Sequence, residues 1–185
     1  MGDLKSELEA IFRQPPACPK NKKYDSIAQL YDEYREHLED TCVQDPCGEK
    51  NFFRPENFAH LVKLEFFNQK IKAWVDANSA IAINQLRTKT LDETRYRIGD
   101  ESRPRTLFWT SDIIVDPDSI HENRRNNATE VYAKRFARAN GNISLKLVVI
   151  EKRFDLQLVV KTSFWSDEDY HKECVKYPPK YQRRK

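Results

Sequence analysis

Three segments near the C-terminus alternate apolar and polar residues along their length. They cover residues 130–136 (EVYAKRF), 144–153 (SLKLVVIEKR) and 156–165 (LQLVVKTSFW). A period of two residues is what a strand with one buried and one exposed face requires. The polar positions are mostly Lys, Arg, Thr and Ser, which suit a phosphate backbone better than the surface of another protein. The chain is therefore expected to build a β-meander with a cationic face.

Helical periodicity dominates the half of the chain that precedes these strands. Apolar residues recur every three or four positions, and Pro55 occupies a favoured first position of a helix. The expected helices cover residues 3–12, 24–39, 55–75 and about 78–86. A further β-like segment is expected at 106–115. Helices followed by a meander predict an α+β fold, with N-terminal helices packed against a C-terminal antiparallel sheet of about four strands.

Composition sets the domain organisation and the cellular setting. The chain has 185 residues, and its 32 basic and 29 acidic residues give a net charge of only +3. We expect a helical N-terminal extension at 1–48, an α+β domain at 49–170 and a basic tail at 171–185. The charged N-terminus and the lack of a long apolar stretch predict a cytoplasmic protein without a leader or a membrane span.

Several classes of enzyme are excluded by the absence of their motifs. The sequence contains no HExxH, GxxxxGK[ST], GxGxxG or GxSxG, and its four cysteines are too dispersed for a zinc ribbon. Asp112, Asp116 and Asp118 could hold Mg²⁺, but they stand at an expected turn, where Asp is common anyway. The sequence therefore predicts neither a metal site nor a cofactor.

His60 is the titratable residue best placed for chemistry. It stands in the segment FAHLVKL, on an expected helix, where an imidazole at the edge of the core is an equally open interpretation. An imidazole titrates near neutral pH and is suited to general acid or base catalysis. Lys63 follows three residues later on the same helix face and is a candidate for RNA binding.

Basic residues also stand before and within the expected strands. Arg103 or Arg105 can bind a phosphate through a bidentate guanidinium, although a solvated surface arginine is the plainer alternative for either. Lys134 and Arg135 are adjacent in one strand and point to opposite faces. Lys134 is a candidate for RNA binding. Arg135 would sit at the edge of the apolar face, where it could stabilise developing charge.

The last expected strand offers a cation and two hydroxyls. Strict alternation places Lys161 and Ser163 on one face and Thr162 on the other, between apolar neighbours. Lys161 is unusual because it follows a nearly apolar stretch, whereas Thr162 could simply be a strand-forming residue. Together they predict a phosphate site, with Lys161 and Thr162 near the chemistry and Ser163 in contact with RNA.

The order of these motifs resembles the phage-associated Barnase–EndoU–colicin–RelE-like (BECR) nucleases over about residues 50–168. The shared features are a helical His followed by Leu, an Arg before an amphipathic segment that ends in a DPDSI turn, a Tyr-x-Lys/Arg strand, and a final strand with a Thr and an aromatic residue. In this chain they are His60 and Leu61, Arg103 or Arg105, 116–120, 132–136 and 161–164.

The resemblance implies a metal-independent endoribonuclease on helices packed against a four-stranded antiparallel sheet. Such an enzyme activates a ribose 2′-OH for attack on the adjacent phosphate and leaves a 2′,3′-cyclic phosphate. RNA would be its substrate, and an immunity or antitoxin protein its partner if the protein is a toxin or a phage effector. The implied roles are a base or acid at His60 with help from Lys161 or Lys134, phosphorane stabilisation by Arg105 and Arg135, and phosphate positioning by Thr162 or Ser163.

Two other hypotheses stay open at this point. The chain has only one well-placed histidine, so a second acid or base would have to be Lys, Arg or His121. A non-catalytic RNA- or protein-binding module with a nuclease-like fold is therefore the first alternative. An interaction domain that works through the acidic segment 24–45 is the second. The enzyme hypothesis requires that His60, Arg105, Arg135 and Lys161 converge on one cleft.

Overall fold

A computed structural model describes residues 23–153 and 155–183, so the helix expected at 3–12 lies outside the described residues. The strands are β1 (Cys42–Gln44), β2 (Lys50–Phe52), β3 (Leu64–Asn68), β4 (Ala73–Asp76), β5 (Tyr96–Ile98), β6 (Ser119–Glu122), β7 (Thr129–Ala137), β8 (Ile143–Lys152), β9 (Leu158–Ser166) and β10 (Tyr181–Gln182). The α-helices are α2 (Ile27–His37), α3 (Phe58–Leu61), α4 (Ser79–Arg87), α5 (Ser102–Arg105), α6 (Trp109–Val115) and α7 (Glu168–Cys174), and the 3₁₀ turns are η1 (Pro55–Asn57) and η2 (Glu93–Arg95).

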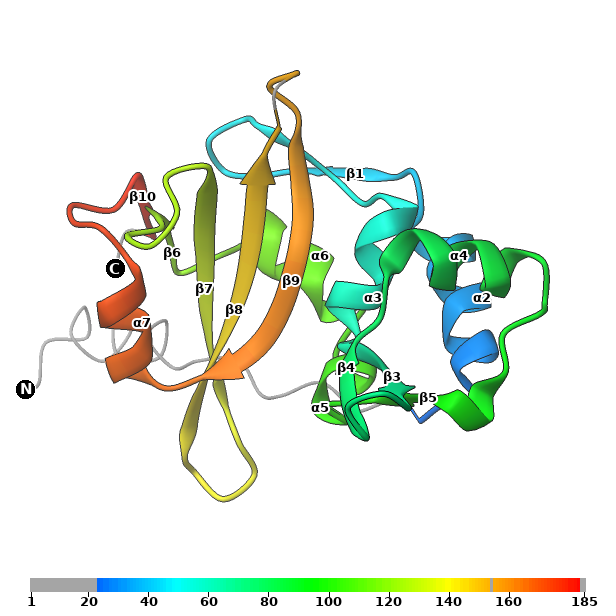
Figure 1. Ribbon diagram of the computed structural model, residues 1–185. Helices are drawn as coiled ribbons and strands as arrows, with labels where there is room; N and C mark the ends of the chain where they lie inside the picture. Colours follow the sequence, from blue (N-terminus) through cyan, green and yellow to red (C-terminus); the bar gives the residue numbers. More distant parts are fainter. Residues whose placement is uncertain (1–22, 154, 184–185) are drawn as a thin grey trace, which may run out of the picture.

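The strands form two sheets (Figure 1). The larger sheet has seven strands in the order β1-β2-β9-β8-β7-β6-β10, and its long, curved centre is β7, β8 and β9. Its neighbouring strands are antiparallel except β2 and β9, which run parallel. The smaller sheet has the order β4-β3-β5 and lies beside α3 and α4. Residues 42–44 and 181–182 thus add strands to the large sheet from both ends of the described chain.

The predicted architecture of helices packed against about four antiparallel strands is wrong. The seven-stranded sheet is mixed, and a second sheet occupies much of the segment expected to be one long helix. That helix ends at Leu61, because the segment from Leu64 onward is rich in aromatic and branched residues that pair across β3 and β4. Most of the β-like segment 106–115 forms α6 instead, which covers Trp109–Val115. Periodicity alone does not separate a short buried helix from a strand.

The three strands expected near the C-terminus are present as β7, β8 and β9. Asn140 to Asn142 make the expected turn between β7 and β8, and Gly141 adopts φ +81°, a left-handed conformation that glycine reaches without strain. The expected helix at 24–39 is α2, whose Ser26 side chain accepts a hydrogen bond from the backbone N–H of Gln29. The predictions from local sequence are therefore correct for the segments that have several periods of alternation, a turn sequence or a helix cap.

The main hydrophobic core lies between one face of the large sheet and the helices. Tyr31 of α2, Phe58 of α3 and Ile113 of α6 are fully buried there against strand residues such as Val148. A smaller cluster on the opposite face includes Val131, Ala133, Leu145, Leu147 and Val175. In the described part of the chain, no helix has the length and apolar character that crossing a membrane requires.

A buried pair of histidines joins α7 to β6. His121 and His171 stack edge to face, with ring centroids 5.2 Å apart. Burial lowers the pKa of His121, against an opposing hydrogen bond to the Lys176 carbonyl. Burial and the neighbouring His121, Arg135 and Lys172 lower the pKa of His171 to about 4, although Glu168 opposes the shift. Both rings are therefore neutral in the folded protein at pH 7.

We expect the folded state to lose stability as the pH falls from about 6.5 towards 4. In that window the unfolded chain binds a proton at each histidine before the folded chain does, so protonation favours unfolding. The loss should be on the order of 2 kcal/mol and should shrink in His171→Phe, measured by urea unfolding at several pH values. The exposed His37 serves as a control, because His37→Gln should leave the pH dependence unchanged. An equal pH profile for wild type and His171→Phe would contradict this account.

Candidate functional site

A pocket of about 210 Å³ opens where α3, β4, α5 and β9 meet. It contains five of the residues that the sequence singled out, although they come from segments as much as a hundred residues apart. The residues that line it are Ala59, His60, Lys63, Leu64, Asp76, Ala77, Arg103, Lys161 and Thr162. An imidazole, three cationic side chains and one carboxylate thus face a common space.

Arg103 holds this pocket together. Its Nη1 donates hydrogen bonds to the backbone carbonyl of His60 and to Oγ1 of Thr162, each at 3.0 Å. Its Nε donates to Oδ2 of Asp100 at 3.3 Å. Burial alone would raise the pKa of Asp100, but hydrogen bonds from Ser102 and the charge of Arg103 outweigh burial and hold this pKa below its ordinary value. Asp100 therefore stays charged and fixes the guanidinium.

A β-bulge places Lys161 and Thr162 on the same side of β9, where both line the pocket. Val149 of β8 pairs with Thr162, whereas Ile150 pairs with Val160, so Lys161 has no partner opposite it. The extra residue changes the side-chain alternation: Ser163 points into the main core, while Thr162 lies on the other face. Lys161 Nζ then reaches Oε1 of Glu151 at 2.9 Å and stays about one third exposed.

His60 and Lys63 come from the end of α3. The backbone of His60 is anchored through its carbonyl, while its imidazole is exposed and has no hydrogen-bond partner in the described chain. Lys63 has φ +53°, a left-handed conformation that commonly ends a helix and here turns the chain into β3. Within residues 23–153 and 155–183, the Lys63 ammonium makes no ion pair, so its charge is available to a ligand.

Asp76 was not anticipated from the sequence. It is the last residue of β4, where it pairs with Glu65, and its exposed side chain lines the pocket. It stands between the helices expected at 55–75 and about 78–86, so nothing indicated that this carboxylate would line a pocket with His60. Its carboxylate adds a second group that can carry a proton to a pocket that already contains an imidazole.

Lys134 and Ser163 lie outside the pocket and are poorly placed to contact RNA. Lys134 is buried, and its Nζ donates hydrogen bonds to the backbone carbonyl and to Oδ2 of Asp116, at 2.6 and 2.7 Å. This pair fixes the turn between α6 and β6. Ser163 is also buried, and its hydroxyl has no partner within the described residues. Both residues belong to the interior of the protein.

Arg105 and Arg135 are also absent from the pocket. Arg105 lies on the surface of α5, where its guanidinium is 4.0 Å from the carboxylate of Glu101. Arg135 Nε donates to Glu168 Oε1 at 2.7 Å and so connects β7 to α7. Two of the four residues required to converge do so, and Arg103, the other arginine of the motif, takes the place expected for Arg105.

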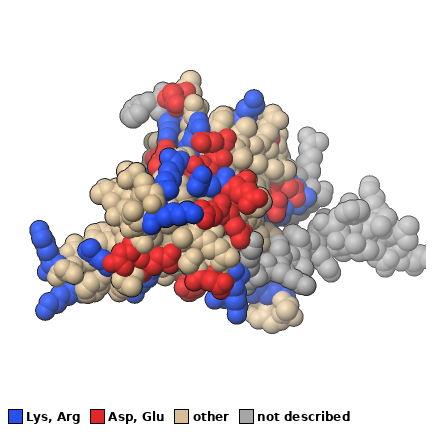
Figure 2. Space-filling view, turned by 90° about the vertical axis from the view of Figure 1, so that its right-hand side faces the viewer, with Lys and Arg blue, Asp and Glu red and all other residues tan. Residues whose placement is uncertain are grey.

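Charge is mixed rather than segregated on one face of the molecule. On the face that carries α2 and α4, the Lys and Arg side chains lie interspersed with Asp and Glu side chains (Figure 2). In the described part of the chain, no three His, Cys, Asp or Glu residues gather in a way that could hold a metal ion. The face shown in Figure 2 therefore offers no wide basic surface to a ligand with negative charge.

Comparisons of this chain with protein-family models, with curated proteins and with solved structures give no match. The chemistry of the pocket is therefore the basis for assigning a function to this chain.

A buried lysine lies next to this site, on the core side of the sheet. Lys146 of β8 is 0% exposed, and its Nζ donates a hydrogen bond to Thr106 Oγ1 at 2.7 Å. Burial lowers its pKa to about 7, and the charge of Arg103 adds to the shift, although Asp100 opposes it. The Nζ atom is also 5.2 Å from the centre of the Trp165 ring. Lys146 thus supports the end of α5 that follows Arg103.

We expect Lys146→Met to stabilise the protein at pH 7 by about 1–3 kcal/mol, because burying an ammonium without a carboxylate is unfavourable. The folded-state pKa lies below the unfolded value, so wild-type stability rises between pH 7 and 10 and the gain of the variant should fade there. Urea unfolding across this range measures both effects. Lys152→Met, at an exposed position of the same strand, is the control and should show neither. A variant less stable than wild type at pH 7 would overturn this explanation.

Proposed function

We propose that the pocket binds a phosphodiester of RNA and that the protein is a metal-independent endoribonuclease. The observation that carries this proposal is the convergence of His60, Asp76, Arg103 and Lys161 on one small pocket. An imidazole and a carboxylate can exchange protons, and two cations can stabilise the charge of a reacting phosphate. The BECR resemblance, which includes His60 and Lys161, supports the same reaction.

The proposed reaction is an in-line attack by a ribose 2′-OH on the adjacent phosphorus. One of the pair His60 and Asp76 takes the proton of the 2′-OH as the new P–O bond forms. The other gives a proton to the leaving 5′-oxygen as its bond to phosphorus breaks. The products are a 2′,3′-cyclic phosphate and a free 5′-hydroxyl, and the chain itself supplies both proton transfers.

The cations would stabilise the pentacoordinate transition state. Asp100 and Glu151 hold Arg103 and Lys161 in fixed positions, and Lys63 adds a charge that is not already paired within the described chain. Thr162 accepts a hydrogen bond from Arg103 and lies 3.5 Å from the carbonyl of His60. Its hydroxyl is therefore a positioning group that keeps β9 and α3 in register, rather than a contact to phosphate.

The biological setting is part of the same proposal. A ribonuclease of this kind would act on cytoplasmic RNA, as a toxin or as an effector of a phage or mobile element. An immunity or antitoxin protein would then restrain it, and covering the pocket is the direct way to do so.

A non-catalytic RNA-binding module is the second candidate. Arg103 and Lys161 already have carboxylate partners, and His60 is the only imidazole that lines the pocket. These features favour a site that holds phosphate without cleaving it. The two candidates differ in whether products form.

We expect the purified protein to cut single-stranded RNA in EDTA and to leave 2′,3′-cyclic phosphate ends. His60→Ala and Asp76→Asn should each slow cleavage by about 100-fold or more, since each removes a proton carrier. The rate is measured with an end-labelled oligonucleotide, and a single 2′-deoxy substitution at the cleaved position should abolish it. His37→Ala, at an exposed histidine of α2, is the control. Intact RNA after long incubation with wild type would rule out the enzyme and leave the binding module.

Both candidates predict that Lys161→Gln weakens RNA binding. The slope of log affinity against log salt should decrease by about 0.7, the value for one lost contact between a cation and a phosphate of a single strand. Fluorescence anisotropy at several salt concentrations measures this slope. Lys152→Gln removes an exposed charge from the neighbouring strand without touching the pocket and should change little. Equal losses in the two variants would show that binding depends on overall charge and not on this pocket.

A further inference from the structure

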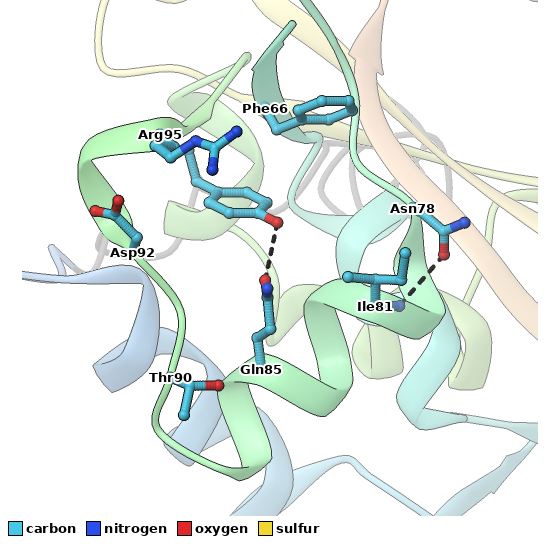
Figure 3. A pocket seen from close by; sticks show the side chains of 8 residues that line it. Phe66, Asn78, Ile81, Gln85, Thr90, Asp92 and Arg95 are labelled. Carbon is cyan, nitrogen blue, oxygen red and sulfur yellow. Dashed lines mark hydrogen bonds between the residues drawn. The ribbon is translucent and has the colours of Figure 1, made fainter.

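A second pocket, of about 260 Å³, lies between α4, η2 and the small sheet (Figure 3). Its walls combine aromatic, aliphatic and polar side chains, which Figure 3 shows arranged around a common hollow. The residues that line it are Phe66, Asn78, Ile81, Gln85, Thr90, Asp92, Arg95 and Tyr96. None of them lines the pocket that contains His60, Arg103 and Lys161, hereafter the basic pocket.

Apolar side chains form two sides of this hollow. Phe66 and Tyr96 are register partners on β3 and β5, and their ring centroids are 6.4 Å apart. Ile81 projects from α4 across the hollow and is 56% exposed, which is unusual for a large aliphatic side chain. A flat ring inserted between these side chains would cover apolar surface that is now in contact with water.

The polar groups of the hollow have unused hydrogen-bonding capacity. Gln85 Oε1 accepts a hydrogen bond from the Tyr96 hydroxyl at 2.9 Å, which leaves the two N–H donors of its amide for a ligand. Asn78 Oδ1 caps α4 by accepting from the N–H of Ile81, and its amide nitrogen is likewise left to donate. Both amides are thus fixed through their oxygen atoms and offer donors.

A cation and a carboxylate complete the hollow. Arg95 makes no ion pair with any of the residues that the structure describes. Asp92 accepts hydrogen bonds from Thr94 on Oδ1, which leaves Oδ2 as an acceptor. Arginine and amide groups pair with the N7 edge of purines, and a carboxylate accepts from the amino groups of bases. The donors and acceptors therefore match the edge of a purine, while the apolar walls match its faces.

We propose that this pocket binds a purine base. This inference rests on the proposed function in one respect: the base would belong to a nucleotide next to the phosphate in the basic pocket. Asn78 of this pocket follows Asp76 of the basic pocket by two residues, so their Cα atoms are at most about 7 Å apart. Neighbouring units of one RNA strand would reach both pockets, and a purine beside the cleaved bond would be preferred.

Nucleosides test the purine pocket without the phosphate site, because they carry no phosphate. Adenosine and guanosine, titrated into ¹⁵N-labelled protein, should give saturable shifts of amide signals in α4 and in residues 90–96, whereas cytidine and uridine should bind about tenfold more weakly. Ile81→Trp fills the hollow and should weaken purine binding by about tenfold or more. Arg95→Ala should affect guanosine more than adenosine, because arginine pairs with O6 and N7 of guanine.

Ile71→Trp is the matched control, since Ile71 is 61% exposed on the turn between β3 and β4 and does not line the pocket. It should bind purines as wild type does. Shifts that do not saturate, equal binding of all four nucleosides, or equal loss in the two tryptophan variants would overturn the proposal. These outcomes do not depend on RNA cleavage. Failure of the nuclease proposal and failure of the purine pocket can therefore be told apart.

Discussion

The Arg103 guanidinium is the interaction on which the arrangement of the basic pocket depends. It joins α5 to the carbonyl that ends α3 and to a hydroxyl on β9, and Asp100 fixes it from its own segment. Hydrogen bonds that involve a charged donor are roughly twice as strong as neutral ones. The positions of His60 and Lys161 relative to each other are therefore set by one side chain that also carries charge into the site. Arg103 both positions the residues of the pocket and brings positive charge into it. The neighbouring Arg105 cannot replace it, because the Arg105 guanidinium lies on the surface of α5 near Glu101.

The bulge in β9 is the second constraint, and it acts through the edge of the sheet. β2 pairs with β9 only at Leu158 and Val159. The rest of β9 has no neighbouring strand on that side, and α3 and α5 pack against it instead. Without the extra residue, Thr162 would share a face with Val160 and point into the core. The bulge instead places Thr162 on the same face as Lys161, which is beside Glu151, so that both residues line the pocket with Arg103.

The sequence predicted those elements whose signals are long enough to repeat. β7, β8 and β9 show several periods of alternation, and α2 and α4 carry both a stripe and a cap, so all of them were located. β1, β2, β6 and β10 have two to four residues, too few for any period, and only tertiary pairing creates them. The same limit applies to the site. His60, Lys63, Lys161 and Thr162 were found as single residues, but the choice between Arg103 and Arg105, and the presence of Asp76, depend on packing between segments that no spacing encodes.

Charge balance limits how this protein would recognise RNA under the proposed function. The net charge is +3 over 185 residues, and acidic and basic groups are interspersed on the face shown in Figure 2, so that face offers no wide basic surface to a phosphate backbone. Two of the cations in the basic pocket also have carboxylate partners. Affinity would then depend on short-range contacts to one or two nucleotides, namely a phosphate in one pocket and a stacked base in the other. Bases are accessible in this way only in unpaired RNA, because the deep major groove of a duplex hides their edges. The two pockets on either side of residues 76–78 therefore fit single-stranded RNA and not a double helix.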